Sequence, residues 1–302
     1  MSSYDVIILG GGPGGISALL WCNSLGLRAV LLEREAELGG QMLQMFHPVI
    51  DYPGLLPADG KALRDQFTAQ LEQLKLTYRT GCEVEAVKLA ARRVRVQGEW
   101  LEACALILAT GARQRRLDIP GAAQFAWYED PHGQVTYAGQ PACVIGGGDS
   151  AIENSLVLAQ ACPSVTVLHR SASFRARPEW LEAARATPNI TLLPQHEPLE
   201  IRGTDRVQSV RYRHTPTGVE QEMTVGAVFV RIGIEPNTEL FRDQLELNKT
   251  GYIRVDARQQ SSLAGVYAVG DVCDPVCRSI ATAVGHGAIA AKAAAEALRS
   301  AN

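Results

Sequence analysis

The stretch Val6-Ile7-Ile8-Leu9-Gly10-Gly11-Gly12-Pro13-Gly14-Gly15 decides how this chain folds. Its four apolar residues predict a buried strand. The glycines after them predict a tight turn into a helix, because glycine lets the backbone turn sharply and approach a ligand closely. A helix that begins in this way holds a pyrophosphate at its N-terminus. The stretch therefore predicts a βαβ unit that binds a dinucleotide.

The helix is expected over 14–25 and the second strand over 29–32, which ends in Glu33. An acidic residue at that point accepts hydrogen bonds from the adenosine ribose hydroxyls of NAD or FAD. A βαβ unit without a ligand is the alternative, and it leaves the placement of the acid unexplained. The residues predicted to bind this first dinucleotide are Gly10, Gly12, Pro13, Gly14, Gly15 and Glu33.

The same pattern returns at Gly146-Gly147-Gly148-Asp149-Ser150-Ala151, directly after the apolar run Cys143-Val144-Ile145. A helix is expected over 150–162 and a second strand over 165–168. This strand ends in His169-Arg170 rather than in an acid. Guanidinium groups suit a ribose 2′-phosphate, which favours NADP(H) over NAD(H), and a merely solvated basic loop is the alternative. The residues predicted to bind here are Gly147, Gly148, Asp149, Ser150, His169, Arg170 and Arg175.

Two further strands, over 105–112 and 228–237, end in similar turns and are expected to carry the chain between domains. The predicted fold class is α/β, with two Rossmann-like domains of the three-layer ββα type, the second inserted in the first. The first domain is expected at 1–113 and 236–302, and the second at 114–235. Two dinucleotide sites in one chain are the layout of a flavin-dependent oxidoreductase.

Composition excludes several other classes of protein. The 302 residues carry a net charge of −3, which gives no indication of nucleic acid or an anionic membrane as partner. The chain is expected to enter a strand by about residue 5, which leaves no room for a signal peptide and predicts a cytoplasmic location. The seven cysteines are an odd number, which is atypical of a secreted disulfide framework. Those expected to be core residues are Cys22, Cys82, Cys104, Cys143 and Cys162.

The chain resembles the low-molecular-weight, thioredoxin-reductase-like flavoproteins over essentially its whole length. The motifs that carry the resemblance are Gly10–Gly15, Leu38-Gly39-Gly40-Gln41, Ile50-Asp51-Tyr52-Pro53-Gly54, Ala109-Thr110-Gly111, Gly146–Ala151, His169-Arg170, Ile232-Gly233 and Gly270-Asp271.

The resemblance implies FAD in the first domain, a homodimer and, in many members, a second domain that rotates. It also adds Ile232 and Gly233 to the second nucleotide site. The further FAD-binding residues that it implies are Arg34, Gly40, Gln41, Asp51, Val84, Ala109, Thr110, Gly111, Gly270, Asp271, Arg278, Ser279 and Ile280.

Three positions depart from the family pattern. Where thioredoxin reductases carry a redox-active Cys-x-x-Cys, this chain reads Glu129-Asp130-Pro131-His132, so thiol chemistry cannot occur there. Ser171 stands where NADPH-using members have a second arginine, and this leaves both NADP(H) and a second FAD open for the second domain. Asp51 stands where many relatives have asparagine.

Cys273 and Cys277 follow the Gly270-Asp271 motif, in a segment that the resemblance places along the flavin. We predict that they form a redox pair, because Pro275 favours a turn between them. Arg278 and the helix start are expected to lower a thiol pKa there. Two unrelated small residues are the alternative, and a zinc site lacks its four ligands. A Cys-x-x-x-Cys is also found in the diflavin-linked disulfide oxidoreductases, a branch that this chain resembles.

The predicted function is a flavin-dependent disulfide/dithiol oxidoreductase, with Cys273 and Cys277 passing electrons to a thioredoxin-like or other thiol partner. Ferredoxin or flavodoxin is a possible electron donor. The first alternative is a ferredoxin- or flavodoxin-NADP reductase of the thioredoxin-reductase-like type, which needs no cysteine. The second is a flavin-binding sensor without turnover. No metal, nucleic-acid or membrane partner is expected.

Overall fold

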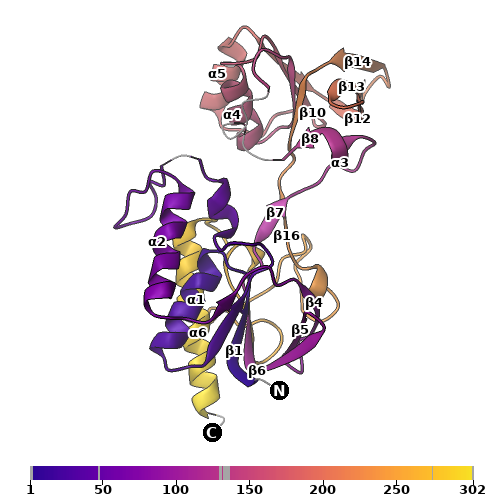
Figure 1. The fold of residues 1–302 in the computed structure, drawn as a ribbon. Coiled ribbons are helices and arrows are strands. Elements are labelled where there is room, and N and C mark those ends of the chain that lie inside the picture. The colour runs from indigo at the N-terminus through magenta and orange to yellow at the C-terminus, as the bar shows by residue number, and fades with distance from the viewer. Residues whose placement is uncertain (1–2, 47, 129–130, 132–136, 274, 301–302) are drawn as a thin grey trace. The chain divides into compact units, whose positions relative to one another are not determined.

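The computed structural model of the chain describes residues 3–46, 48–128, 131, 137–273 and 275–300 (Figure 1). Its contacts divide the chain into two compact units. Unit 1 comprises Met1–Arg113 and Glu235–Asn302, and unit 2 comprises Gln114–Ile234. Each unit combines parallel and antiparallel strand pairs with helices. The predicted α/β class is therefore confirmed.

Unit 1 is built on a sheet in which β1, β2, β3 and β17 run parallel to β6, while β4 and β5 extend it as an antiparallel hairpin. Residues 6–9 of β1 and the whole of β2 are buried apolar runs, as parallel strands covered on both faces require. The elements are β1 (Ser3–Leu9), α1 (Pro13–Ser24), β2 (Ala29–Leu32), η1 (Gly40–Gln44), α2 (Gly60–Gln73), β3 (Tyr78–Arg79), β4 (Val84–Lys88), β5 (Arg93–Val96), β6 (Glu99–Leu108), η3 (Glu239–Phe241), β17 (Val266–Ala268), η4 (Gly270–Cys273) and α6 (Ile280–Ser300).

Helices α1, α2 and α6 gather on one face of the unit 1 sheet (Figure 1). Alanines and glycines let α1 and α6 approach closely: a Cβ on Gly287 would lie 2.3 Å from the carbonyl oxygen of Gly14. A larger residue at Gly287 would therefore force these two helices apart. Because α1 begins at the glycine motif, this contact also fixes where the helix N-terminus lies.

Unit 2 repeats the parallel arrangement in the strand order β11-β10-β9-β15-β8 and adds an antiparallel sheet, β12-β13-β14. The strand after the second glycine motif covers the expected 165–168 and one residue more, while its helix ends earlier than expected. The elements are α3 (Ala122–Phe125), β8 (Ala126–Trp127), β9 (Ala142–Gly146), α4 (Asp149–Leu158), β10 (Val165–His169), α5 (Pro178–Ala186), β11 (Ile190–Pro194), β12 (His196–Gly203), β13 (Val207–His214), β14 (Glu220–Thr224) and β15 (Ala227–Arg231).

Two short strands carry the chain from one unit to the other. They are β7 (Ala112–Gln114) and β16 (Ile234–Pro236), and they pair with each other in a two-stranded sheet. In the part of the chain that the structure describes, no helix combines the length and apolar character that crossing a membrane requires.

Candidate functional site

The glycines of the first motif have different tasks. Gly10 adopts φ +108°, and a Cβ there would lie 2.3 Å from the carbonyl oxygen of Ala109. A Cβ on Gly15 would lie 1.9 Å from the carbonyl oxygen of Gly10. These two glycines allow strand and helix to pack, whereas Gly12, the N-cap of α1, has open space where its Cβ would be. The residues thus fit a pyrophosphate, because the open face of Gly12 lies at a helix N-terminus.

Glu33 is buried directly after β2 and is fixed by two backbone groups. Its Oε2 accepts a hydrogen bond from the Gly11 amide at 2.5 Å, and its Oε1 accepts one from the Glu35 amide at 2.8 Å. A carboxylate has about four lone-pair sites, so capacity remains for ribose hydroxyls. The next residue, Arg34, is exposed and pairs with Glu35 at 3.1 Å.

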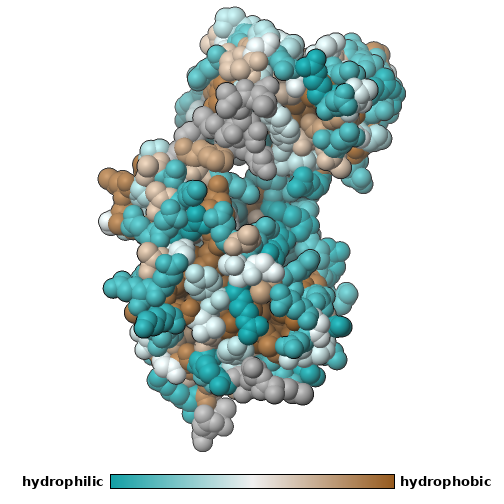
Figure 2. Space-filling model, viewed as in Figure 1, coloured by the Kyte–Doolittle hydropathy of each residue, from teal (hydrophilic) through white to brown (hydrophobic). Residues whose placement is uncertain are grey.

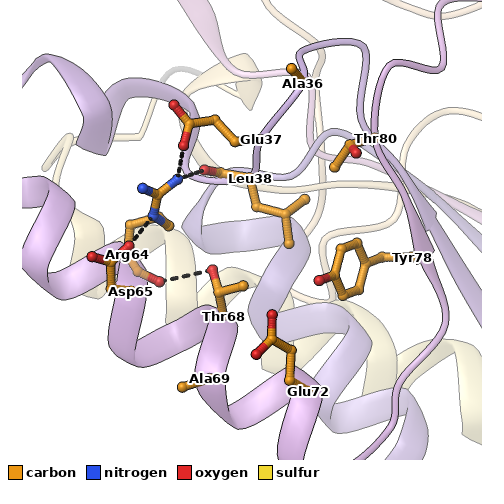
Figure 3. A pocket seen from close by; sticks show the side chains of 10 residues that line it. All are labelled: Ala36, Glu37, Leu38, Arg64, Asp65, Thr68, Ala69, Glu72, Tyr78 and Thr80. Atoms are coloured by element: carbon orange, nitrogen blue, oxygen red, sulfur yellow. Dashed lines mark hydrogen bonds and ion pairs between the residues drawn. The ribbon is translucent and has the colours of Figure 1, made fainter.

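A buried arginine that sequence reasoning missed holds the loop after Glu33. The guanidinium of Arg64, on α2, donates to Glu37 at 2.6 Å, to Asp65 at 2.6 Å and to the Leu38 carbonyl at 3.0 Å (Figure 3). A Cβ on Gly39 would meet the Arg64 side chain at 2.8 Å, so the loop lies directly on it. Arg64 thereby fixes the chain that enters η1.

A shallow pocket lies beside this arginine, between the loop after β2 and one face of α2 (Figure 3). Glu37 and Arg64 are on one side of it, and Tyr78 and Glu72 are on the other. The described residues contain no group of three or more His, Cys, Asp or Glu side chains placed to hold a metal ion.

Two residues predicted to bind FAD meet directly. Gln41, in η1, donates from Nε2 to the Asp271 carboxylate, in η4, at 3.0 Å. Gly270 adopts φ +73°, and its amide donates to Nδ1 of His286 at 3.4 Å. The turn that carries Asp271 is therefore held from η1 on one side and from α6 on the other.

The turn after β6 is locked by Asn237. Thr110 Oγ1 donates to the Asn237 carbonyl at 2.8 Å, and Asn237 Nδ2 donates to the Thr110 carbonyl at 2.7 Å. The Asn237 amide donates to the Gly111 carbonyl at 3.0 Å. Arg113 in turn donates to Asn237 Oδ1 at 2.9 Å and pairs with Glu235 at 2.9 Å. Thr110 and Asn237 are 127 residues apart, and Arg113 and Glu235 are 122 apart, so no local signal indicated these bonds.

The start of α6 is shaped by its own side chains. Ser279 accepts a hydrogen bond from the Thr282 amide at 3.1 Å, which is the geometry of an N-cap, and the helix begins at Ile280. The guanidinium of Arg278 lies 5.3 Å from the centre of the Tyr252 ring and donates to its hydroxyl at 3.3 Å.

The remaining predicted FAD residues lie apart from these contacts. Ala109 is buried at the end of β6, and Val84 begins β4 opposite Val96. Asp51 is exposed in the loop between η1 and α2. That loop also exposes large apolar side chains, and a brown area covers it in Figure 2. These side chains are Met45, Phe46, Ile50 and Leu56.

The two cysteines of the predicted pair differ in exposure. Both are free thiols; Cys277 is exposed, whereas Cys273 is mostly buried against the core of unit 1. Burial, together with the Asp271 carboxylate, raises the pKa of Cys273 to about 12. The expectation that Arg278 lowers a thiol pKa is therefore wrong for Cys273, because that guanidinium contacts Tyr252 and the thiol lies in an apolar setting.

The other cysteine prediction holds in four of its five positions. Cys22, Cys82, Cys143 and Cys162 are buried, and Cys104 is exposed. Cys104 lies on β6 before its buried half, where alternate residues face solvent.

The glycines of unit 2 divide their tasks as those of unit 1 do. Gly146 adopts φ +154°, and a Cβ there would lie 2.2 Å from the Arg231 carbonyl oxygen. A Cβ on Gly147 would lie 2.2 Å from the His169 ring, whereas the Cβ of Gly148 would meet open space. Gly148 is the N-cap of α4, so this helix N-terminus also fits a phosphate.

His169, a predicted nucleotide-binding residue, lies in the core of unit 2. The ring is buried, packs 5.0 Å from the Phe174 ring and bonds the Ser173 carbonyl at 3.0 Å. Burial lowers its pKa, and the neighbouring Arg175 and Arg170 lower it further. The ring is neutral at pH 7 and supports the Gly147 backbone, so the cations left for a phosphate are arginines.

The arginines lie on a loop that folds back onto the glycine motif. The Arg175 amide donates to the Gly147 carbonyl at 2.7 Å. The guanidinium of Arg177 pairs with the Asp149 carboxylate at 3.1 Å, so this predicted nucleotide-binding side chain already has a partner. The same guanidinium lies 4.0 Å from the centre of the Trp180 ring. Arg170 is exposed at the end of β10.

The remaining residues of unit 2 that were predicted to bind the second nucleotide lie at the start of α4 and after β15. Ser150 is exposed in the first turn of α4. Ile232 packs against the core of unit 2, and the Gly233 carbonyl accepts a hydrogen bond from the Arg115 amide at 2.9 Å. His132 lies outside the described residues, as do Glu129 and Asp130.

Two helix N-termini begin with an open glycine, one beside a buried acid and one beside a loop of arginines, and this arrangement is typical of a dinucleotide-binding oxidoreductase. The chain belongs to the pyridine nucleotide-disulphide oxidoreductase family, whose pattern matches residues 4–287. It is an FAD-dependent oxidoreductase of the thioredoxin-reductase-like kind.

Individual relatives agree with this assignment. The chain is 38% identical to the thioredoxin reductase of Mycolicibacterium smegmatis over 299 residues, 95% of this chain and 94% of the relative. It is 35% identical to the bifunctional thioredoxin reductase/thioredoxin of Mycobacterium leprae, across 95% of this chain and 64% of the relative. The crystal structure of Lactococcus lactis thioredoxin reductase in the FR conformation superposes with a TM-score of 0.85 at 31% identity, covering 98% of this chain and 99% of that one.

Proposed function

We propose that the protein is a disulfide/dithiol oxidoreductase in which Cys273 and Cys277 form the redox pair. The observation that carries this proposal is their place in the chain: they follow the Gly270-Asp271 turn, which Gln41 holds within unit 1. The Cys-x-x-Cys position of thioredoxin reductases holds no cysteine here. Thiol chemistry in this chain therefore needs another pair.

Their different exposure assigns the two thiols different tasks. The exposed Cys277 meets the partner, and its thiolate attacks one sulfur of the partner disulfide to form a mixed disulfide. The mostly buried Cys273 then attacks Cys277 Sγ, which releases the partner as a dithiol and leaves a Cys273–Cys277 disulfide. Two electrons and two protons pass to the partner in this exchange.

FAD bound to unit 1 would supply the two electrons that return this disulfide to the dithiol. The residues that would hold it include Gly12, at the open N-terminus of α1, and Glu33, which has lone pairs free for ribose hydroxyls. Asp271 and Gln41 would hold the ribityl and pyrophosphate portion together with the Thr110 turn. The outside donor is either NADPH or a reduced carrier such as ferredoxin or flavodoxin.

The second nucleotide is NADP(H) or a second FAD. The open Gly148 supports a phosphate at the start of α4, and the exposed Arg170 and Arg175 support an additional negative charge such as a 2′-phosphate. The neutral His169 adds no charge to that site. The decisive measurement is the ratio of FAD to protein after denaturation: a ratio near one favours NADP(H), and a ratio near two favours a diflavin protein.

The partner is a thioredoxin-like protein, as the name of the M. leprae relative supports. We further propose a homodimer in the cytoplasm. The exposed apolar loop between η1 and α2 favours association, because soluble proteins rarely leave several large apolar side chains together in water.

The test compares Cys273→Ser and Cys277→Ser with Cys104→Ser, a control at another exposed position. We expect both pair variants to keep FAD but to lose electron transfer to a thioredoxin-like disulfide, while Cys104→Ser keeps both. Transfer that survives in both pair variants contradicts the proposal. If NADPH bleaches FAD rapidly and a one-electron carrier is reduced in all three, the ferredoxin- or flavodoxin-NADP reductase takes its place.

A further inference from the structure

His286 bonds to the turn that carries Asp271, although it lies 16 residues along the chain on α6. Its Nδ1 accepts the hydrogen bond of the Gly270 amide at 3.4 Å. An imidazole nitrogen accepts only while it is unprotonated, so in this arrangement the ring is neutral and carries its hydrogen on Nε2. A protonated His286 cannot hold Gly270 in this way.

Among the described residues, few charged groups lie on the elements that pack against α6. Two of the elements that pack against α6, namely α1 and β17, contain no Asp, Glu, Lys or Arg. A third, β6, carries Glu99 and Glu102 in its first half, whereas the strand ends at Leu108. In η4 the groups that titrate are Asp271 and Cys273. Burial lowers the pKa of His286, and the Asp271 carboxylate opposes this by favouring the protonated ring.

The neighbouring turn is anchored on both sides. Gln41 bonds the Asp271 side chain from η1, and His286 bonds the Gly270 backbone from α6. Gly270 has φ +73°, a conformation that glycine adopts at low cost, and its amide is held by the hydrogen bond to His286. Loss of that acceptor frees the amide of a residue in the predicted FAD site.

We propose that His286 is a positioning residue for FAD: its neutral ring fixes the Gly270-Asp271 turn for the cofactor, and protonation of the ring releases that turn. The proposal rests on the family's FAD and on contacts within unit 1. It does not depend on the role of Cys273 and Cys277, because neither thiol takes part in the Gly270–His286 bond.

The expected pH dependence has a definite sign. The pKa of His286 lies below its ordinary 6.5, so the hydrogen bond to the Gly270 amide is complete at neutral and higher pH. The bond is lost as the pH falls through this lowered pKa. FAD affinity is therefore constant from about pH 8 to 6.5 and then weakens, by up to about tenfold per pH unit for a single proton. The pyrophosphate diester of FAD does not titrate in this range.

The experiment measures the FAD dissociation constant of the apoprotein by flavin fluorescence from about pH 5.5 to 8. His286→Asn keeps an acceptor near the place of Nδ1 and cannot titrate, so we expect affinity close to the native protein at pH 8 and no weakening in acid. His286→Leu removes the acceptor, so we expect affinity about threefold to tenfold weaker at every pH. His214→Asn, in β13 of unit 2, is the control and should keep the native profile.

Circular dichroism and thermal unfolding of each apoprotein establish that the variants fold. Should His286→Leu fail to fold, the profile of His286→Asn decides the question. An acid weakening in His286→Asn equal to that of the native protein overturns the proposal, and so does native affinity at pH 8 in a folded His286→Leu. Failure of the redox pair is a separate result, because it is read in dithiol exchange with FAD still bound.

Discussion

Gln41 Nε2 lies 3.0 Å from the carboxylate of Asp271, a bond between two segments that are 230 residues apart in the sequence. It brings the loop after the first βαβ unit against the turn before the last helix. The two residues come from motifs that the sequence analysis placed in one site, and the structure brings them into contact.

Gln41→Glu tests this bond by placing a second carboxylate opposite Asp271. We expect FAD affinity to fall by about tenfold or more, and Gln41→Ala to lose less, because a neutral side chain removes one hydrogen bond of about 1 kcal/mol without adding repulsion. Fluorescence titration with FAD measures both. Gln44→Glu, exposed in the same η1, is the matched control. Equal FAD affinities for Gln41→Glu and Gln44→Glu would show that the contact between Gln41 and Asp271 does not contribute to FAD binding.

Gly12→Ala and Gly15→Ala separate ligand binding from folding. The Gly12 Cβ would meet open space, so we expect an apoprotein of native thermal stability that has lost FAD. The Gly15 Cβ would lie 1.9 Å from the Gly10 carbonyl, so we expect a loss of at least about 2 kcal/mol in the free energy of unfolding. Urea unfolding of the two apoproteins measures the difference. If Gly12→Ala retains its full FAD content, the prediction of a phosphate at the N-terminus of α1 is contradicted.

The cysteines of the reduced protein should differ in alkylation. With a pKa raised to about 12 from 9.0, Cys273 carries roughly a thousandfold less thiolate than an ordinary thiol near pH 8, and its reaction should quicken as the pH rises. The exposed Cys277 and Cys104 should react first. Mass spectrometry of the alkylated peptides over time measures the order. Equal rates for Cys273 and Cys104 would show that the Cys273 thiol is not shielded.

Arg64→Met should weaken the loop that leads to Gln41. Removing the guanidinium takes away hydrogen bonds to Glu37, Asp65 and the Leu38 carbonyl, and we expect a loss of about 1–3 kcal/mol in the free energy of unfolding together with weaker FAD binding.

The control for Arg64→Met is Arg258→Ala, which breaks an exposed ion pair with Glu296 and should cost less free energy of unfolding than Arg64→Met. Urea unfolding and FAD titration measure both variants. Equal losses in the free energy of unfolding would mean that the buried hydrogen bonds of Arg64 stabilise the fold no more than an exposed ion pair does.

The sequence by itself determined the two glycine motifs, the strands beside them and the acid at Glu33. The physical reason is local: a strand-to-helix turn needs glycine at fixed offsets, and apolar runs mark buried parallel strands. The same local logic predicted α1 and β2 to within a residue at each end.

Only the tertiary structure decided what each of these residues does. It showed that Gly12 and Gly148 face open space, while Gly10 and Gly146 meet a neighbouring strand. It also placed His169 in the core, where desolvation lowers the pKa of its ring, so the arginines carry the positive charge of this segment.

Arg64, Asn237 and the burial of Cys273 had no signal in the sequence. Their partners are remote along the chain, and a single sequence does not state which remote segments meet. Hydrogen bonding and the pKa of a side chain depend on the neighbours and the solvent that the folded chain gives it. The type of each residue is written in the sequence, whereas its charge state and its task follow from where the fold puts it.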